Sequence, residues 1–107
     1  MSILSLNKIN LKSILSIWLD VSKSKIDVCC LISDNKDINF QIQNTKQWII
    51  DFINILKDNN FDLKIPLIIE STWDYNTLAC LLLSENLFNV KEINPIITKN
   101  YVKHTIR

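Results

Sequence analysis

Three apolar runs follow one another in the first half of the chain, with only three polar residues between each run and the next. The runs are residues 14–21, 25–33 and 37–43, and the last alternates apolar and polar positions, as a half-exposed strand does. The connections, 22–24 and 34–36, are too short for a crossover and can only reverse the chain. This part of the sequence therefore predicts an antiparallel meander of three strands.

The chain contains no glycine, so every tight turn must use Asn, Asp, Ser or Lys instead. Its 107 residues suffice for one domain with a core, and an apolar content of 48% excludes a disordered tail. The net charge of +1 favours no partner by itself. Residues 1–13, interrupted by Lys8 and Lys12, are neither a secretory signal nor a membrane span; we expect an N-terminal arm on a cytoplasmic protein.

A helix is predicted directly after the meander. Asn44 or Thr45 would cap it, and residues 58–60 would end it. Its apolar positions have the spacing of an amphipathic helix that lies on a sheet: Trp48, Ile49, Phe52, Ile53 and Leu56. Residues 65–70 then form a short apolar run typical of a buried parallel strand.

A second helix, a fifth strand and a last helix complete the pattern. Ser71 and Asp74 have capping-box spacing, with Thr72 as the competing cap, so we expect a well-buried helix that ends near Glu85. We expect Asn86 to adopt the left-handed conformation that glycine would otherwise take. The fifth strand covers residues 88–93. Pro95 opens a last helix, which carries the following polar residues: Lys99, Tyr101, Lys103 and His104.

The resulting order, βββ-α-β-α-β-α, requires a mixed sheet with helices packed against it. The fourth strand can join either free edge of the meander. If it pairs beside the first strand, the two run parallel, and Asp20 and Glu70 both fall near their C-terminal ends. Open α/β sheets place their functional sites at that end.

Asp20 and Glu70 are the main candidates for chemistry, because each closes a strongly apolar run. Taken singly, such a carboxylate often only accepts backbone N–H groups or caps a turn. Taken together at one end of parallel neighbours, the two make a pair of hard oxygen ligands suited to magnesium or manganese.

The cysteines and tryptophans have less specific settings. Cys29, Cys30 and Cys80 lie in apolar runs, and we interpret them as reduced, mostly buried thiols that bind no metal. The tryptophans are interpreted as packing residues rather than stacking platforms for bases: Trp18, Trp48 and Trp73.

Three segments follow one another with the order and spacing of a known family. They are residues 18–23 (WLDVSK) with 26–28 (IDV), residues 68–75 (IIESTWDY), and residues 93–95 (INP) with Lys99 and Lys103 beyond them. Together they resemble the DEDD-type insertion-sequence transposases, relatives of the pilin-gene invertases and of the bridge-RNA-guided recombinases. The likeness extends from about residue 17 to Arg107.

The resemblance implies an RNase H-like, RuvC-like α/β fold: a mixed five-stranded sheet in the order 3-2-1-4-5 with flanking helices. It implies that Asp20 and Glu70 are the first Asp and the Glu of the DEDD tetrad. Both would act as catalytic metal ligands, with magnesium as the implied ion in DNA strand cleavage and transfer during transposition. Residues 14–107 would form this domain after the arm. DNA is the implied partner, and a guide RNA and homo-oligomers stay open.

The sequence departs from the family pattern in two places. Trp73 and Asp74 stand where the family usually has glycine, and the final Lys-Thr-Asp-x-x-Asp motif does not occur before Arg107. We therefore expect the chain alone to bind magnesium weakly and to cleave no DNA. Lys99, Lys103 and Arg107 are the candidate nucleic-acid contacts, whereas Asp27 is interpreted as a surface residue of a hairpin and Asp74 as a charge in the first turn of a helix.

Two other functions share features of this sequence. An actin-like or sugar-kinase ATPase begins with the same order of elements, but it needs glycine in its first hairpin to approach phosphate, and residues 22–24 provide none. The second is a non-catalytic remnant of a transposase that serves only to bind nucleic acid or protein. The sequence leaves this alternative open.

Overall fold

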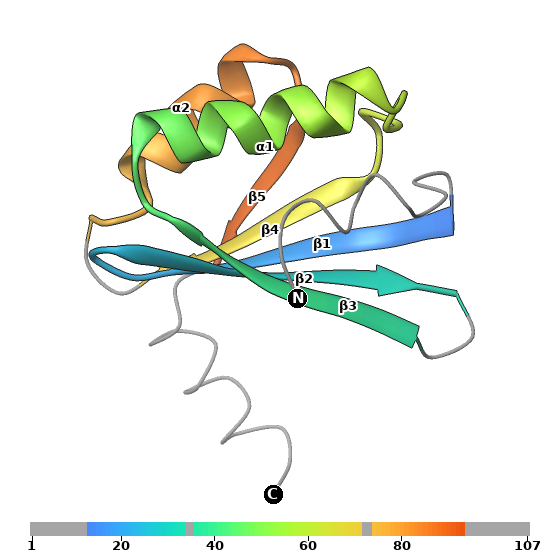
Figure 1. Ribbon diagram of the computed structural model, residues 1–107, viewed down its shortest axis with the longest axis horizontal. Helices are drawn as coiled ribbons and strands as arrows, with labels where there is room; N and C mark the ends of the chain where they lie inside the picture. The colour runs from blue at the N-terminus through green and yellow to red at the C-terminus, as the bar shows by residue number, and fades with distance from the viewer. Residues whose placement is uncertain (1–12, 34–35, 72–73, 94–107) are drawn as a thin grey trace, which may run out of the picture.

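The computed structural model describes residues 13–33, 36–71 and 74–93 (Figure 1). Within these ranges the elements follow in the order β1 (Ile14–Val21), β2 (Lys25–Ile32), β3 (Lys36–Gln43), α1 (Lys46–Asp58), β4 (Pro66–Ser71), α2 (Thr77–Glu85) and β5 (Asn89–Ile93). The predicted elements are confirmed as far as β5. The last helix predicted from Pro95, with His104, lies outside the described residues, as does most of the arm at residues 1–13.

The strands form one mixed sheet in the order β3-β2-β1-β4-β5. β1 pairs antiparallel with β2 and parallel with β4, and β4 pairs parallel with β5. The fourth strand therefore joins the edge of the meander formed by β1, which was the choice that the sequence left open. The α/β class and the RNase H-like strand order 3-2-1-4-5 are confirmed.

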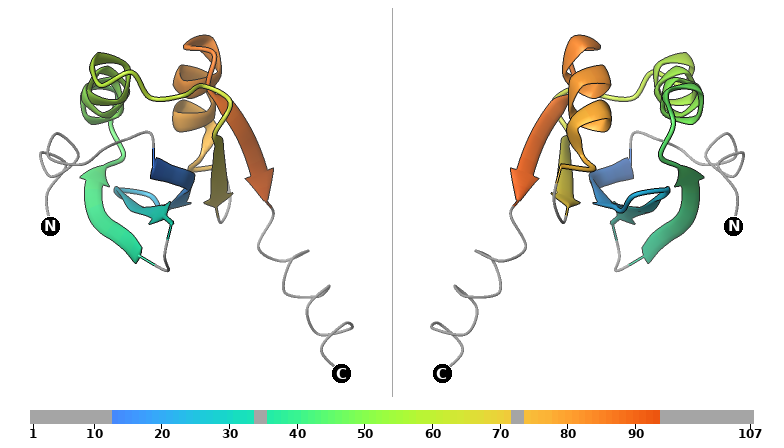
Figure 2. Two further views of the ribbon diagram at one scale, coloured as in Figure 1. Left: turned by 90° about the vertical axis from the view of Figure 1, so that its right-hand side faces the viewer. Right: turned by 90° about the vertical axis from the view of Figure 1, so that its left-hand side faces the viewer.

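Both described helices cover the same face of the sheet, and the main core lies between the helices and the strands (Figure 2). On β1, Ile17, Leu19 and Val21 are buried, whereas the alternate residues Trp18 and Asp20 are exposed. This two-residue period puts the apolar side chains against the helices and the polar ones on the opposite face. No helix among the described residues covers that opposite face, so it is called the open face below.

The two helices end in the same way although the chain has no glycine. Asn60 follows α1 with a φ of 57°, and Leu87 follows α2 with a φ of 69°. After each, a phenylalanine N–H bonds back to the helix: Phe61 to the Leu56 carbonyl at 3.0 Å, and Phe88 to the Leu83 carbonyl at 3.1 Å. These are Schellman motifs, and the rings of the two phenylalanines lie 6.1 Å apart, so the ends of the helices contact each other.

The left-handed residue after α2 is Leu87, and the prediction that Asn86 would take this conformation is wrong. Asn86 has a φ of −94°, and its side-chain Nδ2 donates to the Leu82 carbonyl at 2.7 Å. The oxygen of the same side-chain amide, Asn86 Oδ1, accepts a hydrogen bond from Lys57 Nζ at 2.7 Å. The bond from Lys57 joins α1 to α2 through the Asn86 side chain, and the left-handed residue is the next one along, Leu87.

Leu87→Gly is expected to raise the free energy of unfolding by about 0.5–1 kcal/mol, since the side chain is 76% exposed and its left-handed backbone is unfavourable for leucine. Leu81→Gly, at an exposed position inside α2, should instead lower it by about 1 kcal/mol or more. Urea unfolding measures both. A loss of stability in Leu87→Gly would show that the backbone there carries no such cost.

The start of α2 differs from the prediction. The helix begins at Thr77 with Asn76 as its N-cap, so the capping box expected from Ser71 and Asp74 is wrong. Asp74 lies in the preceding turn, where its carbonyl accepts from the Thr77 backbone N–H at 3.2 Å and from Thr77 Oγ1 at 2.9 Å. No acidic residue stands in the first turn, and the competing cap Thr72 lies outside the described residues.

Two tryptophans expected to pack in the core or at a helix cap are partly exposed, and α2 is less buried than expected. Trp18 is 37% exposed because it lies on the open face, and Trp48 is 36% exposed in the first turn of α1. Leu81 on α2 is 53% exposed. Trp73 lies outside the described residues. In the described ranges, no helix is long and apolar enough to span a membrane.

Candidate functional site

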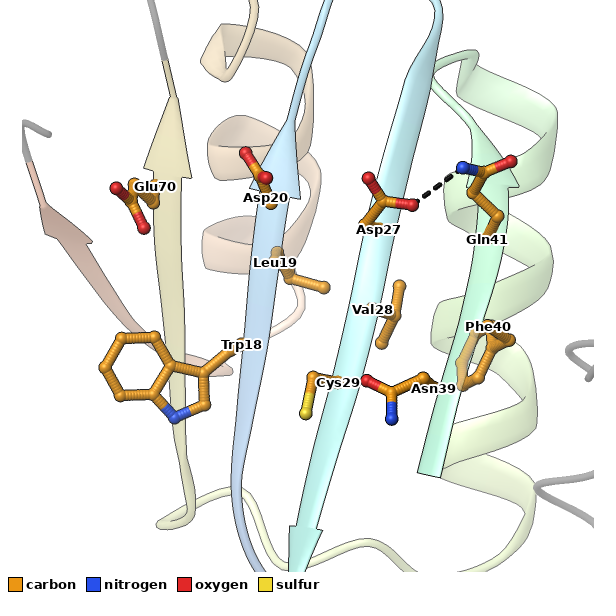
Figure 3. Close-up of a pocket in the computed structure, with 10 residues that line it drawn as sticks. All are labelled: Trp18, Leu19, Asp20, Asp27, Val28, Cys29, Asn39, Phe40, Gln41 and Glu70. Carbon is orange, nitrogen blue, oxygen red and sulfur yellow. Dashed lines mark hydrogen bonds between the residues drawn. The ribbon is translucent and has the colours of Figure 1, made fainter. Parts of the chain in front are cut away.

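Asp20 and Glu70 lie directly opposite each other on the two parallel central strands. The register pairs Asp20 on β1 with Glu70 on β4, one residue before each strand ends. Because paired positions on neighbouring strands share a face, both carboxylates project from the open face, as Figure 3 shows. Asp20 is exposed and Glu70 half-buried. The placement predicted for them from the sequence is confirmed.

The same row continues across the sheet. Asp20 is also paired with Asp27 on β2, and Asp27 with Gln41 on β3. The Gln41 amide Nε2 donates to Asp27 Oδ1 at 2.7 Å, which fixes the Asp27 carboxylate next to Asp20 (Figure 3). From the sequence alone, Asp27 is expected to be a surface residue of a hairpin, with support of the site as the lesser alternative. The alternation of exposed and buried residues along β2 puts Asp27 on the open face. Only the pairing register shows that Asp27 lies next to Asp20.

A hollow of about 510 Å³ lies on the open face below this row. The four polar residues of the row line it together with six neighbours: Trp18, Leu19, Val28, Cys29, Asn39 and Phe40. The indole of Trp18 lies beside the carboxylates on the same face of β1, and its Nε1 donates to Ser16 Oγ at 3.2 Å. The site is thus a polar row beside a partly apolar depression.

The negative charges of Asp20 and Glu70 are not neutralised by any cationic side chain in the described part of the chain. Neither Asp20 nor Glu70 receives a hydrogen bond or an ion pair from a described side chain, and the neighbour of Asp20 on β2 is a third carboxylate, Asp27. Like charges directly opposite each other on neighbouring strands are destabilising. A bound cation would remove this repulsion, and carboxylate oxygens are the donors that Mg²⁺ and Mn²⁺ prefer.

The described residues do not complete a closed metal centre. No group of three or more His, Cys, Asp or Glu side chains within them could hold one ion. Asp74 is exposed in the turn before α2. The candidate nucleic-acid contacts Lys99, Lys103 and Arg107 lie outside the described residues, so their predicted role stays a prediction.

Cys29, Cys30 and Cys80 form no disulfide with one another, and only Cys30 is buried as expected, whereas Cys29 and Cys80 are partly exposed. Burial raises the pKa of Cys30 to about 12, with a further contribution from neighbouring Cys29. Burial and the Glu92 carboxylate raise the pKa of Cys80 to about 11. Burial and Asp37 also raise the pKa of Cys29. Thiols that stay protonated at neutral pH are poor metal ligands and poor nucleophiles.

All three thiols should react with an alkylating reagent in the unfolded chain without prior reduction, whereas at pH 8 the folded chain should protect Cys30 almost completely. Because the raised pKa favours the protonated thiol in the folded state, folding stability should fall as the pH rises above the ordinary value of 9.0 toward 12. Mass spectrometry after timed alkylation measures the protection. Equal labelling rates for Cys29 and Cys30 would contradict it.

Comparison with known proteins bears on this arrangement. No curated protein gives a significant match. A family model for transposases, of the DEDD type named after IS110, matches residues 18–107. The match takes in β1 from Trp18 onward, and with it both Asp20 and Glu70. Because the model covers most of the chain, it confirms the resemblance found in the sequence motifs. The chain belongs to the IS110-type DEDD transposase family.

Proposed function

We propose that this chain is the N-terminal part of the catalytic domain of a DNA transposase, and that Asp20 and Glu70 bind a divalent metal ion for DNA strand cleavage and transfer. The observation that carries the proposal is the register, which pairs the two carboxylates at the C-terminal end of adjacent parallel strands. Residues 14–107 would form the domain and residues 1–13 an arm. Magnesium is the metal that we propose, and DNA is the substrate.

The chemistry of the donors fits such an ion. Asp20 and Glu70 present only oxygen atoms, face the same side of the sheet and receive no hydrogen bond from a described side chain. When bound, the metal would activate a nucleophile and stabilise the leaving oxygen of a phosphodiester. The role of Asp20 and Glu70 is to hold it at the strand ends, where DNA can approach from the open face.

Asp27 and Gln41 support this role without contacting the metal. The bond between them keeps the Asp27 carboxylate in the row, so its negative charge adds to the attraction for a cation at Asp20. A centre with two metal ions is normally held by three or four carboxylates. Asp20 and Glu70 account for part of one, so DNA cleavage is not expected of the 107-residue chain by itself.

Titration with Mn²⁺ should broaden the backbone amide NMR signals around Asp20 and Glu70 first, because the paramagnetic ion acts on nuclei near its binding site. In the double variant Asp20→Asn, Glu70→Gln the local broadening should disappear. Asp58→Asn, Asp62→Asn provides a control with the same loss of charge, at the last residue of α1 and in the segment that follows it, and should leave the broadening intact. Broadening centred elsewhere would refute the proposed metal site and favour a non-catalytic module.

A further inference from the structure

Three exposed lysines gather at the same end of the sheet as the carboxylate pair. Lys23 lies in the turn between β1 and β2, Lys25 is the first residue of β2, and Lys46 is the first residue of α1. Backbone bonds hold the two segments together: the Asn44 N–H donates to the Ser24 carbonyl at 2.9 Å. These three lysines are called the basic surface below.

The basic surface borders a hollow of its own. A depression of about 490 Å³ is lined by Lys23, Ser24, Lys25, Gln43, Asn44 and Thr45. Thr45 is the N-cap of α1, and the first turn of this helix contains no acidic residue. The positive end of the helix dipole therefore adds to the field of the lysines.

The lysines of the basic surface have no described anionic partner. None of the three makes an ion pair or a side-chain hydrogen bond to a described residue, whereas Lys57 at the other end of α1 bonds to Asn86. Their charges are therefore available to a ligand.

The side chain of Asn44 also holds the backbone under the basic surface in place. Asn44 Nδ2 donates to the Ser22 carbonyl at 2.9 Å and to the Tyr75 carbonyl at 3.1 Å. These bonds join the hairpin, the start of α1 and the turn before α2. A surface fixed in this way loses less conformational freedom when a ligand binds.

The basic surface adjoins the row of carboxylates. Lys25 stands two residues before Asp27 on β2, and both side chains are on the open face. Two residues of extended strand span about 7 Å, which is close to the distance between consecutive phosphates in a nucleic-acid strand. A strand bound at Lys25 could therefore continue past Asp27 toward Asp20 and Glu70.

We propose that the basic surface binds the phosphodiester backbone of DNA and leads the strand to the carboxylate pair. The proposal rests on the proposed function for its choice of DNA, since the surface lies beside the residues that would hold the metal. Lysines act as point charges toward phosphate and read no sequence, so the surface would position DNA without selecting a site.

The test is fluorescence anisotropy of the 107-residue chain with a labelled 30-base-pair DNA duplex in EDTA, so that metal binding does not contribute. The triple variant Lys23→Gln, Lys25→Gln, Lys46→Gln should bind at least tenfold more weakly. The slope of log affinity against log salt concentration should fall in magnitude by about two to three, since each lost phosphate contact removes about 0.9.

The matched control is Lys36→Gln, Lys57→Gln, Lys64→Gln, which removes the same charge from the opposite end of the fold. It should bind within about twofold of the unchanged chain, since only the general charge has altered. Equal losses of affinity in the two triple variants would overturn the proposal. Circular dichroism checks that both triple variants fold. The single variant Lys25→Gln is a milder test, and it should change the salt-dependence slope by about one third as much as the triple variant does.

Two further outcomes separate the proposals. Tighter binding to RNA of the same sequence, lost in the same triple variant, would overturn the assignment of DNA. If Mn²⁺ fails to bind at Asp20 and Glu70 while the basic surface still binds DNA in EDTA, the proposed function fails and the DNA-binding surface stands. If Mn²⁺ binds at Asp20 and Glu70 but the basic surface does not bind DNA, the proposed DNA-binding surface fails and the proposed function stands.

Discussion

Asp20→Asn is expected to make the chain more stable without metal and less stable with it. Without metal, the substitution removes a charge that faces Glu70 on one side and Asp27 on the other, which should stabilise the fold by about 0.2–1 kcal/mol. With Mn²⁺ at 100 times its dissociation constant, the unchanged chain should gain about 2.7 kcal/mol, and the variant should gain little of it. Thermal unfolding in EDTA and in Mn²⁺ measures both.

The effect of Asp20→Asn on stability should have opposite signs in EDTA and in Mn²⁺, and this reversal distinguishes a metal ligand from a purely structural residue. A carboxylate that merely stabilised the strand end would make Asp20→Asn less stable in both conditions. Asp51→Asn, at an exposed position on α1, serves as the control. The Asp51 carboxylate accepts a hydrogen bond from Gln47 of the same helix and does not belong to the row of carboxylates on the sheet. The two unfolding curves of Asp51→Asn should shift with Mn²⁺ as those of the unchanged chain do. Parallel shifts in Asp20→Asn would refute the metal-binding role.

Phe52→Ala is expected to lower the free energy of unfolding by about 3–5 kcal/mol, a large part of the stability of a domain of this size. Phe52 is 1% exposed on α1, and its ring lies 6.0 Å from that of Phe40 on β3. The cavity left by alanine would therefore open between the helix layer and the meander. Urea unfolding followed by far-ultraviolet circular dichroism measures the loss.

The control for Phe52→Ala is Asn54→Ala, two residues along the same helix with an exposed side chain. It should change the stability by no more than about 0.5 kcal/mol. A cost below 1 kcal/mol for Phe52→Ala would mean that α1 does not depend on this contact. The packing of the helix layer against the sheet would then need another explanation.

Much of the fold follows from local patterns in the sequence. The short connections 22–24 and 34–36 required the meander, and the periods of two and 3.6 residues placed the described strands and α1 to within a few positions. The position of β4 was different, since both edges of the meander were available to it. The family resemblance implied the strand order that resolved this choice, and the register then placed Asp20 opposite Glu70.

The features that were missed depend on contacts between distant segments. Asp27 acquires its place in the site through Gln41, and the late start of α2 accompanies the bond from Asn44 to the Tyr75 carbonyl. Leu87 takes the left-handed conformation expected of Asn86, whose side chain instead accepts a hydrogen bond from Lys57 on α1. Local spacing predicts which residues are suited to a cap, but it does not show which of them a neighbouring element will use.

The parallel pairing of β1 with β4 also determines when the carboxylate pair can form. During synthesis β1, β2 and β3 leave the ribosome first, and β1 must keep one edge unpaired until β4 has been made. Until then Asp20 lacks Glu70 and has only Asp27 as a neighbouring carboxylate, and the exposed edge of an apolar strand invites wrong pairing. The proposed metal affinity should therefore arise only after β4 has inserted beside β1, which would make the binding of a metal ion a reporter of this long-range pairing, before β5 adds to β4.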